Sequence, residues 1–307
     1  MRFGLALPHY GFSSPGGDAP SFENVAAWAR KAEDLGFDSV WMSDHLFYSF
    51  GRYGADPAPI GSLEAMTTLA GLAALTHRVR LGTLVLCSAF RHPASLAREA
   101  EVIRQVSGDR LDLGVGAGWL EDEFRAFGFA FGSVSERFAR MEQTVQTLAA
   151  QVPSVPRWLG GKGGPRLLRM AARHGAGWNV VWRMSPGAYA GKVVDVGSAC
   201  ESEGCDPATV PLSVGLYGTI GQDEAGARAA FERGRASFPG DAMAAETWAS
   251  WRADTLSGSP DQVLERIGAF EALGVQELIL SPWVLPFAVI EEDQVEIFAE
   301  HVLAGRG

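Results

Sequence analysis

Two hydrophobic periods alternate along the whole chain. Short apolar runs typical of strands recur between segments in which apolar residues have helical spacing. The predicted strands are Arg2–Leu7, Phe37–Met42, Val79–Leu86, Arg110–Val115, Val155–Leu159, Gly177–Val181, Leu212–Ile220 and Val275–Leu280. Strands that alternate with helices in this way indicate a parallel sheet.

The helical segments carry start and stop signals. One apolar stripe is opened by Ser21 and closed by Gly36, and another helix begins with a capping box formed by Ser259 and Gln262. Eight strands alternating with helices are the number that closes a (β/α)8 TIM barrel. We therefore predict an α/β fold of this type, with an open doubly wound sheet as the alternative.

One segment interrupts the rhythm between the seventh and eighth predicted strands. Gln222–Gly258 is too long for a single connection and contains two helical patterns, Asp223–Phe238 and Ala242–Ala253. No low-complexity linker marks a domain boundary, so we interpret the segment as a helical insertion within a single domain, residues 1–307. In a barrel, long loops that follow strands lie over the carboxyl-terminal face, where ligands bind.

Composition disfavours several classes of protein. Lys and Arg total 26 against 36 Asp and Glu, and the net charge of −10 argues against nucleic acid or an anionic membrane surface as a partner. No apolar segment is long enough to cross a bilayer, and the first apolar run is too short for a secretory signal. The 3 cysteines form no CxxC pair, so we expect no disulfide framework, no metal site and a cytoplasmic location.

Glycine-rich turns follow two of the predicted strands. Gly116–Trp119 (GAGW) precedes an acidic helix start, and Gly160–Gly164 (GGKGG) precedes a helix that opens with Pro165 and Arg166. Glycines after a strand let backbone N–H groups approach an anion closely. Neither turn has the spacing of a dinucleotide fingerprint or a P-loop. The pair indicates a phosphorylated ligand; the alternative for the second is a tight turn with two solvated bases.

Asp44 and His45 end the second predicted strand. In a barrel, polar residues directly after a strand lie at the catalytic rim, and a histidine can move a proton near neutral pH. The alternative is a capping aspartate beside a partly buried histidine. For His9, after the first strand, a structural role is favoured. No Ser-His-Asp arrangement or zinc-like cluster is present, which suits a cofactor that supplies the chemistry.

Several motifs, taken in order, resemble the luciferase-like flavin-dependent family. They are SDH at 43–45, LGTLV at 81–85, FRHP at 90–93, GDRLDLGVGAGW at 108–119, ERF at 136–138 and GGKGGPR at 160–166. The resemblance covers most of residues 1–181. It implies a TIM barrel that uses FMN or the deazaflavin coenzyme F420. The residues of the motifs are more similar to the F420-dependent branch than to bacterial luciferase.

The resemblance also implies roles by position. Asp44 and His45 would face the flavin ring, with His45 as the acid/base, and Leu84 and Val85 would form a bulge with a cis peptide bond behind the ring. The residues implied to line the cofactor side chain are Gly116, Ala117, Gly118 and Trp119. Those implied to hold its phosphate are Gly160, Gly161, Lys162, Gly163 and Gly164, with Arg166 and Arg157 as further cations for the acidic tail of F420.

The leading hypothesis is an F420-dependent oxidoreductase that transfers a hydride between the deazaflavin and a small or medium organic substrate. An FMN-dependent luciferase-like monooxygenase and a flavin-binding barrel without catalysis are the alternatives. F420-dependent glucose-6-phosphate dehydrogenases carry Glu and Trp where this chain has Trp119 and Ser49, which disfavours sugar-phosphate oxidation. The sequence is compatible with a homodimer. The short connection from Leu148 to Val155 should leave the substrate side open, or covered by Gln222–Gly258.

Overall fold

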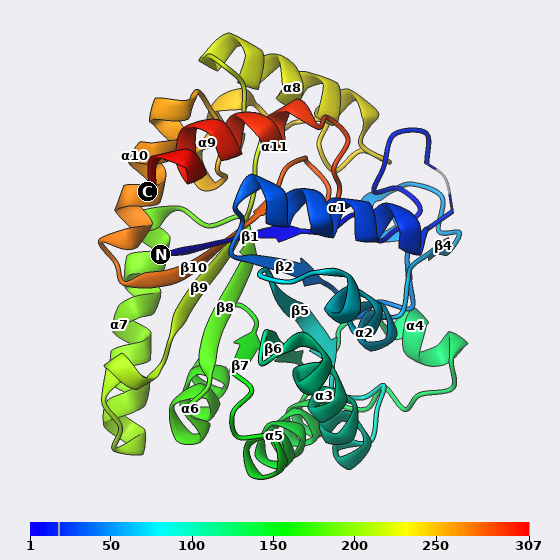
Figure 1. Cartoon of the computed structure of the whole chain (residues 1–307), viewed down its shortest axis with the longest axis vertical. Helices are drawn as coiled ribbons and strands as arrows, with labels where there is room; N and C mark the ends of the chain where they lie inside the picture. Colours follow the sequence, from blue (N-terminus) through cyan, green and yellow to red (C-terminus); the bar gives the residue numbers. More distant parts are fainter. Residues whose placement is uncertain (18, 307) are drawn as a thin grey trace.

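A closed barrel of parallel strands forms the centre of the molecule (Figure 1), in a computed structural model that describes residues 1–17 and 19–306. Around the barrel the strands are β1 (Arg2–Ala6), β2 (Ser39–Met42), β5 (Arg80–Cys87), β6 (Leu111–Gly116), β7 (Arg157–Gly160), β8 (Gly177–Trp182), β9 (Leu212–Tyr217) and β10 (Val275–Ser281), which pairs with β1. Each predicted strand overlaps one of these, so the predicted TIM barrel is confirmed.

Two strand ends differ from the prediction. The strand β7 begins at Arg157, because Pro156 lacks the N–H that a further ladder bond needs and uses only its carbonyl, which accepts from Leu113. The strand β9 ends at Tyr217, and Ile220 beyond it pairs only as an isolated bridge with Gly258.

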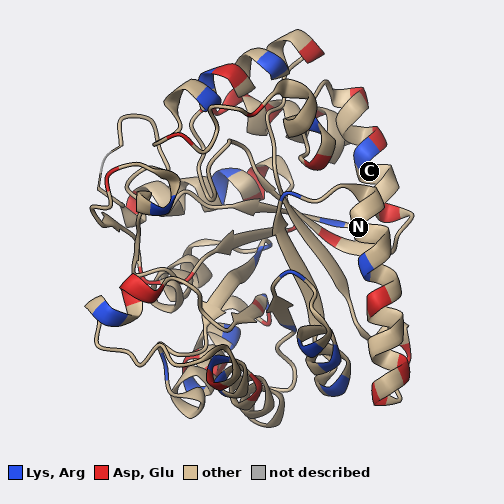
Figure 2. Ribbon diagram, turned by 180° about the vertical axis from the view of Figure 1, so that it is seen from behind, with Lys and Arg blue, Asp and Glu red and all other residues tan. Residues whose placement is uncertain are grey.

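Helices form a layer around the barrel, and Figure 1 shows them outside the strands. They are α1 (Phe22–Leu35), α2 (Ala65–Leu75), α3 (Pro93–Ser107), α5 (Val134–Gln151), α6 (Pro165–His174), α7 (Pro186–Glu203), α10 (Pro260–Glu271) and α11 (Asp293–Phe298). The predicted signals are present: the Ser21 hydroxyl accepts from the N–H of Asn24, and Gly36 ends α1 in the left-handed conformation. In Figure 2 most coloured charged positions are on helices and loops, and the strands are mostly tan.

The segments that follow the strands lie over the carboxyl-terminal end of the barrel. After β2, the short strands β3 (Phe47–Tyr48) and β4 (Ile60–Gly61) pair in antiparallel fashion, and α4 (Glu121–Ala126) follows β6. The insertion contains α8 (Glu224–Ser237) and α9 (Trp248–Asp254).

The insertion reaches the loop between β3 and β4 through aromatic contacts. The Phe238 ring lies 5.6 Å from the Tyr53 ring and 6.1 Å from the Phe50 ring. The insertion therefore covers part of the carboxyl-terminal face, as one of the two sequence expectations stated.

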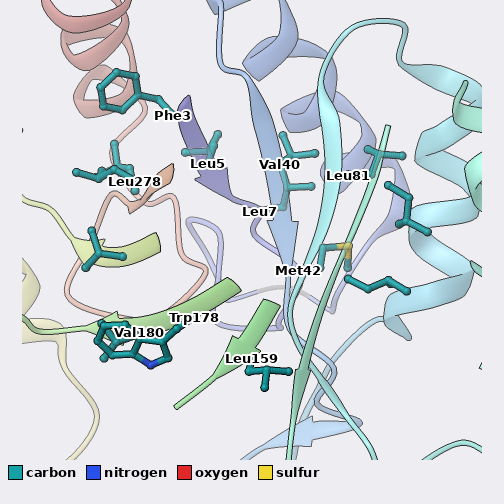
Figure 3. Close-up of a cluster of buried hydrophobic side chains, with 14 of the residues drawn as sticks. Phe3, Leu5, Leu7, Val40, Met42, Leu81, Leu159, Trp178, Val180 and Leu278 are labelled. Carbon is teal, nitrogen blue, oxygen red and sulfur yellow. The ribbon is translucent and has the colours of Figure 1, made fainter. Parts of the chain in front are cut away.

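The core has two parts. Aliphatic side chains fill the space between strands and helices, and Figure 3 shows Leu5, Leu7, Val40 and Met42 among them, all of them fully buried. A second, aromatic cluster combines buried side chains of the strands with those of the segments that follow the strands. Its members include Trp41, Tyr48, Trp158, Trp251 and Phe287.

The opposite end of the barrel is closed by ion pairs. The Arg2 Nε atom lies 2.5 Å from a carboxylate oxygen of Glu277, and the Arg80 Nε atom lies 2.5 Å from one of Asp112. Both carboxylates are fully buried, so each needs its guanidinium partner. Within the described part of the chain, none of the helices is long and apolar enough to cross a membrane.

Candidate active site

A cavity of about 410 Å³ opens at the carboxyl-terminal end of the barrel. It collects most of the residues that the sequence singled out, from the ends of β2, β5, β6 and β7. Those that line it are Asp44, His45, Leu84, Val85, Gly116, Gly118, Trp119, Gly160, Gly161 and Lys162. Motifs that are far apart in the sequence therefore meet in one cavity.

Five of the predicted residues do not line this cavity: Ala117, Arg157, Gly163, Gly164 and Arg166. The Arg157 guanidinium donates to the carbonyl of Val155. Gly164 caps the N-terminus of α6, and the carbonyl of Gly163 accepts from Lys192. The Arg166 guanidinium lies over the Phe138 ring, 4.9 Å from its centre, and donates to Ser135. Arg166 is thus turned toward α5, and its role toward a cofactor stays a prediction.

His45 is held by a carboxylate that the sequence analysis did not single out. The His45 Nδ1 atom lies 2.8 Å from Oε2 of Glu123, whose side chain is only 2% exposed. The other oxygen, Oε1, accepts from the backbone N–H of Leu46 at 2.5 Å. Because an ionised carboxylate only accepts, Nδ1 carries a proton, and Nε2 is the ring atom that can accept or return a second one.

Glu123 belongs to a group of three acidic residues in the first turn of α4, with Glu121 and Asp122. Only Glu123 of the three is buried. The acidic run was visible in the sequence, but its position within a short helix did not reveal which carboxylate faces inward. The nearby phenylalanine Phe124, which is also buried, was the available signal for the inward face of α4.

Asp44 is occupied by other partners. The Arg91 guanidinium contacts both carboxylate oxygens, at 2.6 and 2.8 Å, and the N–H of Cys87 donates to one of them at 2.9 Å. Burial raises the pKa of the Asp44 carboxyl, and Arg91 opposes that rise. This bidentate pair connects the segments after β2 and β5 and favours a positioning role for Asp44.

The wall behind the cavity has the bulge that the resemblance implied. The peptide bond between Leu84 and Val85 is cis, which confirms that prediction, and a second cis bond between Val181 and Trp182 was not predicted. A Cβ atom on Gly116 would lie 2.6 Å from Cγ2 of Val85, and one on Gly160 would lie 2.7 Å from Cγ1. Glycine at both positions is therefore what leaves room for the Val85 side chain.

A hydrogen-bond chain runs from Tyr10 through Ser43 to His9, and its first two members line the cavity. Burial lowers the pKa of His9 to about 3, so the ring is neutral. Its Nδ1 atom lies 2.8 Å from the Leu7 carbonyl, which can only accept, so Nε2 accepts from the Ser43 hydroxyl at 2.9 Å. Tyr10 then donates to Ser43. The role of His9 is structural, as expected, and Tyr10 has only acceptor capacity left.

Aromatic rings form the remaining walls. Trp119 is 45% exposed, and its ring lies 5.5 Å from the His45 ring. On the other side, the Trp182 ring stacks on Tyr217 at 5.5 Å and meets Phe287 edge-on at 5.0 Å. Flat apolar surfaces of this kind suit a planar ligand.

The end of the cavity beside β7 suits an anion. Lys162 has no hydrogen bond or ion pair with any described residue, and it lies beside the exposed backbone of Gly161. The helix α6 begins just beyond, with Gly164 as its N-cap and no side chain capping its N–H groups. The N–H of Gly161 donates to the carbonyl of Asn179, so the donor set for a phosphate consists of the Lys162 ammonium and the N–H groups at the positive end of α6.

Comparisons with known proteins agree with this geometry. An F420-dependent glucose-6-phosphate dehydrogenase of Amycolatopsis mediterranei is 33% identical over 126 residues, which cover 41% of this chain and 36% of that protein. An F420-dependent hydroxymycolic acid dehydrogenase of Mycobacterium tuberculosis is 26% identical over 74% of this chain and 65% of the relative. The chain thus matches only about a third of the length of the first of these relatives.

Solved structures share the fold. An F420-dependent secondary alcohol dehydrogenase, in complex with an F420–acetone adduct, aligns with a TM-score of 0.77 at 18% identity over 100% of this chain and 99% of that chain. A monooxygenase from Streptomyces bottropensis aligns with a TM-score of 0.72 at 23% identity, over 100% of both chains. The fold is therefore common to proteins with different chemistries. The luciferase-like monooxygenase model matches residues 1–151 and 139–277, and the chain belongs to that family.

Proposed function

We propose that this protein is an F420-dependent oxidoreductase that transfers a hydride between the deazaflavin and a small or medium alcohol or carbonyl compound. One observation carries the proposal. His45, fixed by Glu123, faces the same cavity as the phosphate-type donor set around Lys162. A proton carrier and a cofactor cradle are what hydride transfer at a carbinol carbon requires of the protein. Relatives named as F420-dependent dehydrogenases support the choice of cofactor.

The residues present fit a phosphorylated deazaflavin. Its phosphate would be held by Lys162 and by the N–H groups at the N-terminus of α6. The bulge at Val85 would support the ring, and the apolar surfaces of Trp182 and Phe287 would exclude water. When bound, the deazaflavin would supply a ring carbon that accepts or returns the hydride.

The side chains of this protein would handle the proton. The Nε2 atom of His45 would accept the proton of a substrate hydroxyl, and the Glu123 carboxylate would stabilise the imidazolium that forms. Tyr10, whose own proton is given to Ser43, has no proton to donate to the substrate oxygen, which leaves His45 as the proton carrier. In the reverse direction His45 would return the proton to the oxygen of the carbonyl group.

The second candidate is an FMN-dependent monooxygenase. It keeps support from the family, and from fold neighbours that are named as monooxygenases. A phosphate-type donor set suits FMN as well as F420, so the cofactor has to be identified by measuring the binding of both.

Titration of the purified protein with F420 and with FMN, followed by cofactor fluorescence, tests the proposal. We expect F420 to bind more tightly, and Lys162→Gln to weaken that binding about 10-fold while turnover at saturating F420 is largely kept. Lys31→Gln is the matched control, since it removes the same charge from α1, where Lys31 pairs with Glu292 and Glu296 and does not line the cavity. Tighter binding of FMN, with oxygen consumed during turnover, would establish the second candidate instead.

A further inference from the structure

Two cations that line the cavity have no acidic partner among the described residues. The lining carboxylates are engaged elsewhere, since Asp44 pairs with Arg91, and Glu123 accepts hydrogen bonds from His45 and from the backbone of Leu46. Neither Arg52 nor Lys162 has a hydrogen bond or an ion pair with any described residue, although both line the cavity. Two cations without an acidic partner therefore line the cavity of a chain whose net charge is −10.

The two cations are on different sides of the cavity mouth. Arg52 lies in the loop after β2 and Lys162 lies directly after β7, and the strands β5 and β6 separate β2 from β7 around the barrel. Lys162 is beside the backbone donors at α6, which form the phosphate-type donor set. Arg52 is therefore left for a second anion, on the side of His45.

Arg52 is held by aromatic faces. Its guanidinium carbon lies 4.6 Å from the centre of the Trp119 ring and 5.0 Å from that of the Tyr53 ring. The same Trp119 ring lies 5.5 Å from the His45 ring. Stacking orients a guanidinium but leaves the N–H groups at its edge free to bind an anion in bidentate fashion. Arg52 and His45 thus flank one indole.

We propose that Arg52 binds an anionic group of the substrate, and that the site therefore takes flat, apolar alcohols or carbonyl compounds that carry a carboxylate. A carboxylate matches the planar fork of the guanidinium, and the aromatic walls contributed by Tyr48 and Trp119 match a flat apolar body. A ligand anchored at Arg52 has its carbinol carbon beside His45. The assignment of that carbon rests on the proposed function, whereas recognition of the anion does not.

Calorimetric titration of the F420-loaded protein with 4-(hydroxymethyl)benzoate and with its neutral methyl ester tests this inference. We expect the acid to bind about 10-fold more tightly than the ester, in keeping with a charge-assisted hydrogen bond, and added salt to reduce the difference. Arg52→Gln should remove the preference, and Arg52→Lys should restore part of it. Arg125→Gln, the matched control, changes the same charge at an exposed residue of α4 that pairs with Glu121 and should leave the preference intact.

Three results would overturn the inference: equal binding of acid and ester, no binding of the acid, or a loss of F420 affinity in Arg52→Gln as large as the loss for the acid. The last would assign Arg52 to the cofactor. The protein could prefer the acid through Arg52 and yet never reduce F420. That result would uphold this inference and contradict the proposed function. Reduction of F420 by neutral alcohols alone would do the reverse.

Discussion

At the scale of single residues, the site depends on a pair of which the sequence revealed only one member. His45 was predicted because it directly follows a strand, where barrel enzymes place their chemistry. Glu123 was not predicted, because its inward orientation depends on how the short helix α4 packs over the end of β2. Asp44, the immediate neighbour of His45, was predicted as catalytic, but its oxygens are occupied by Arg91. Sequence adjacency therefore identified the rim, and packing determined which carboxylate serves the histidine.

Substitutions of this pair should separate chemistry from binding. We expect His45→Ala to lower kcat by about 10²-fold or more, as for a lost general acid–base, with little change in F420 affinity. Glu123→Gln should lower kcat by about 10-fold or more while KM changes little, because the amide does not stabilise an imidazolium. Glu121→Gln, on the exposed side of α4, is the control and should behave as wild type. Normal turnover in His45→Ala at saturating cofactor would show that the proton role is wrong.

At the scale of elements, the strands and helices of the barrel were predictable, and the small elements above it were not. Buried strands and capped helices carry periodicity and start signals over many residues. The strands β3 and β4 have two residues each, too few for any period. The insertion was visible as an excess of length between two strands, but its contacts with the loop after β2 come from the tertiary structure.

The glycines at the ends of β6 and β7 should stabilise the fold by leaving space for the Val85 side chain. Gly160→Ala would place a Cβ atom 2.7 Å from Cγ1 of Val85, so the bulge has to move. We expect a loss of about 1–3 kcal/mol of unfolding free energy, as for an overpacked core, and a weaker F420 complex. Gly191→Ala, at an exposed position of α7, is the control, since its Cβ atom would meet nothing within 4 Å. Thermal unfolding and cofactor titration of both variants measure the difference, and equal behaviour would contradict the space argument.

At the scale of the whole molecule, the number and order of elements were enough to predict the barrel and the face that carries the site. Parallel strands point the same way, so every segment that follows a strand reaches the same end. This is why motifs from residue 44 to residue 162 meet in one cavity. The opposite end, with its buried Glu277 and Asp112, was not predicted, because isolated charges within strands give no sign of their partners.

The buried His9 should make the stability of the whole fold depend on pH. Its pKa falls from 6.5 to about 3 in the folded chain, so below pH 6.5 the unfolded chain binds a proton that the folded chain does not. The free energy of unfolding should therefore decrease as the pH falls, by up to about 1.4 kcal/mol per pH unit from this residue. Urea unfolding at pH 7, 6 and 5 should show a shallower loss for His9→Gln, which keeps a polar side chain but cannot titrate. His301→Gln, at a more exposed position, should follow wild type, and parallel curves for all three proteins would contradict a neutral, buried His9.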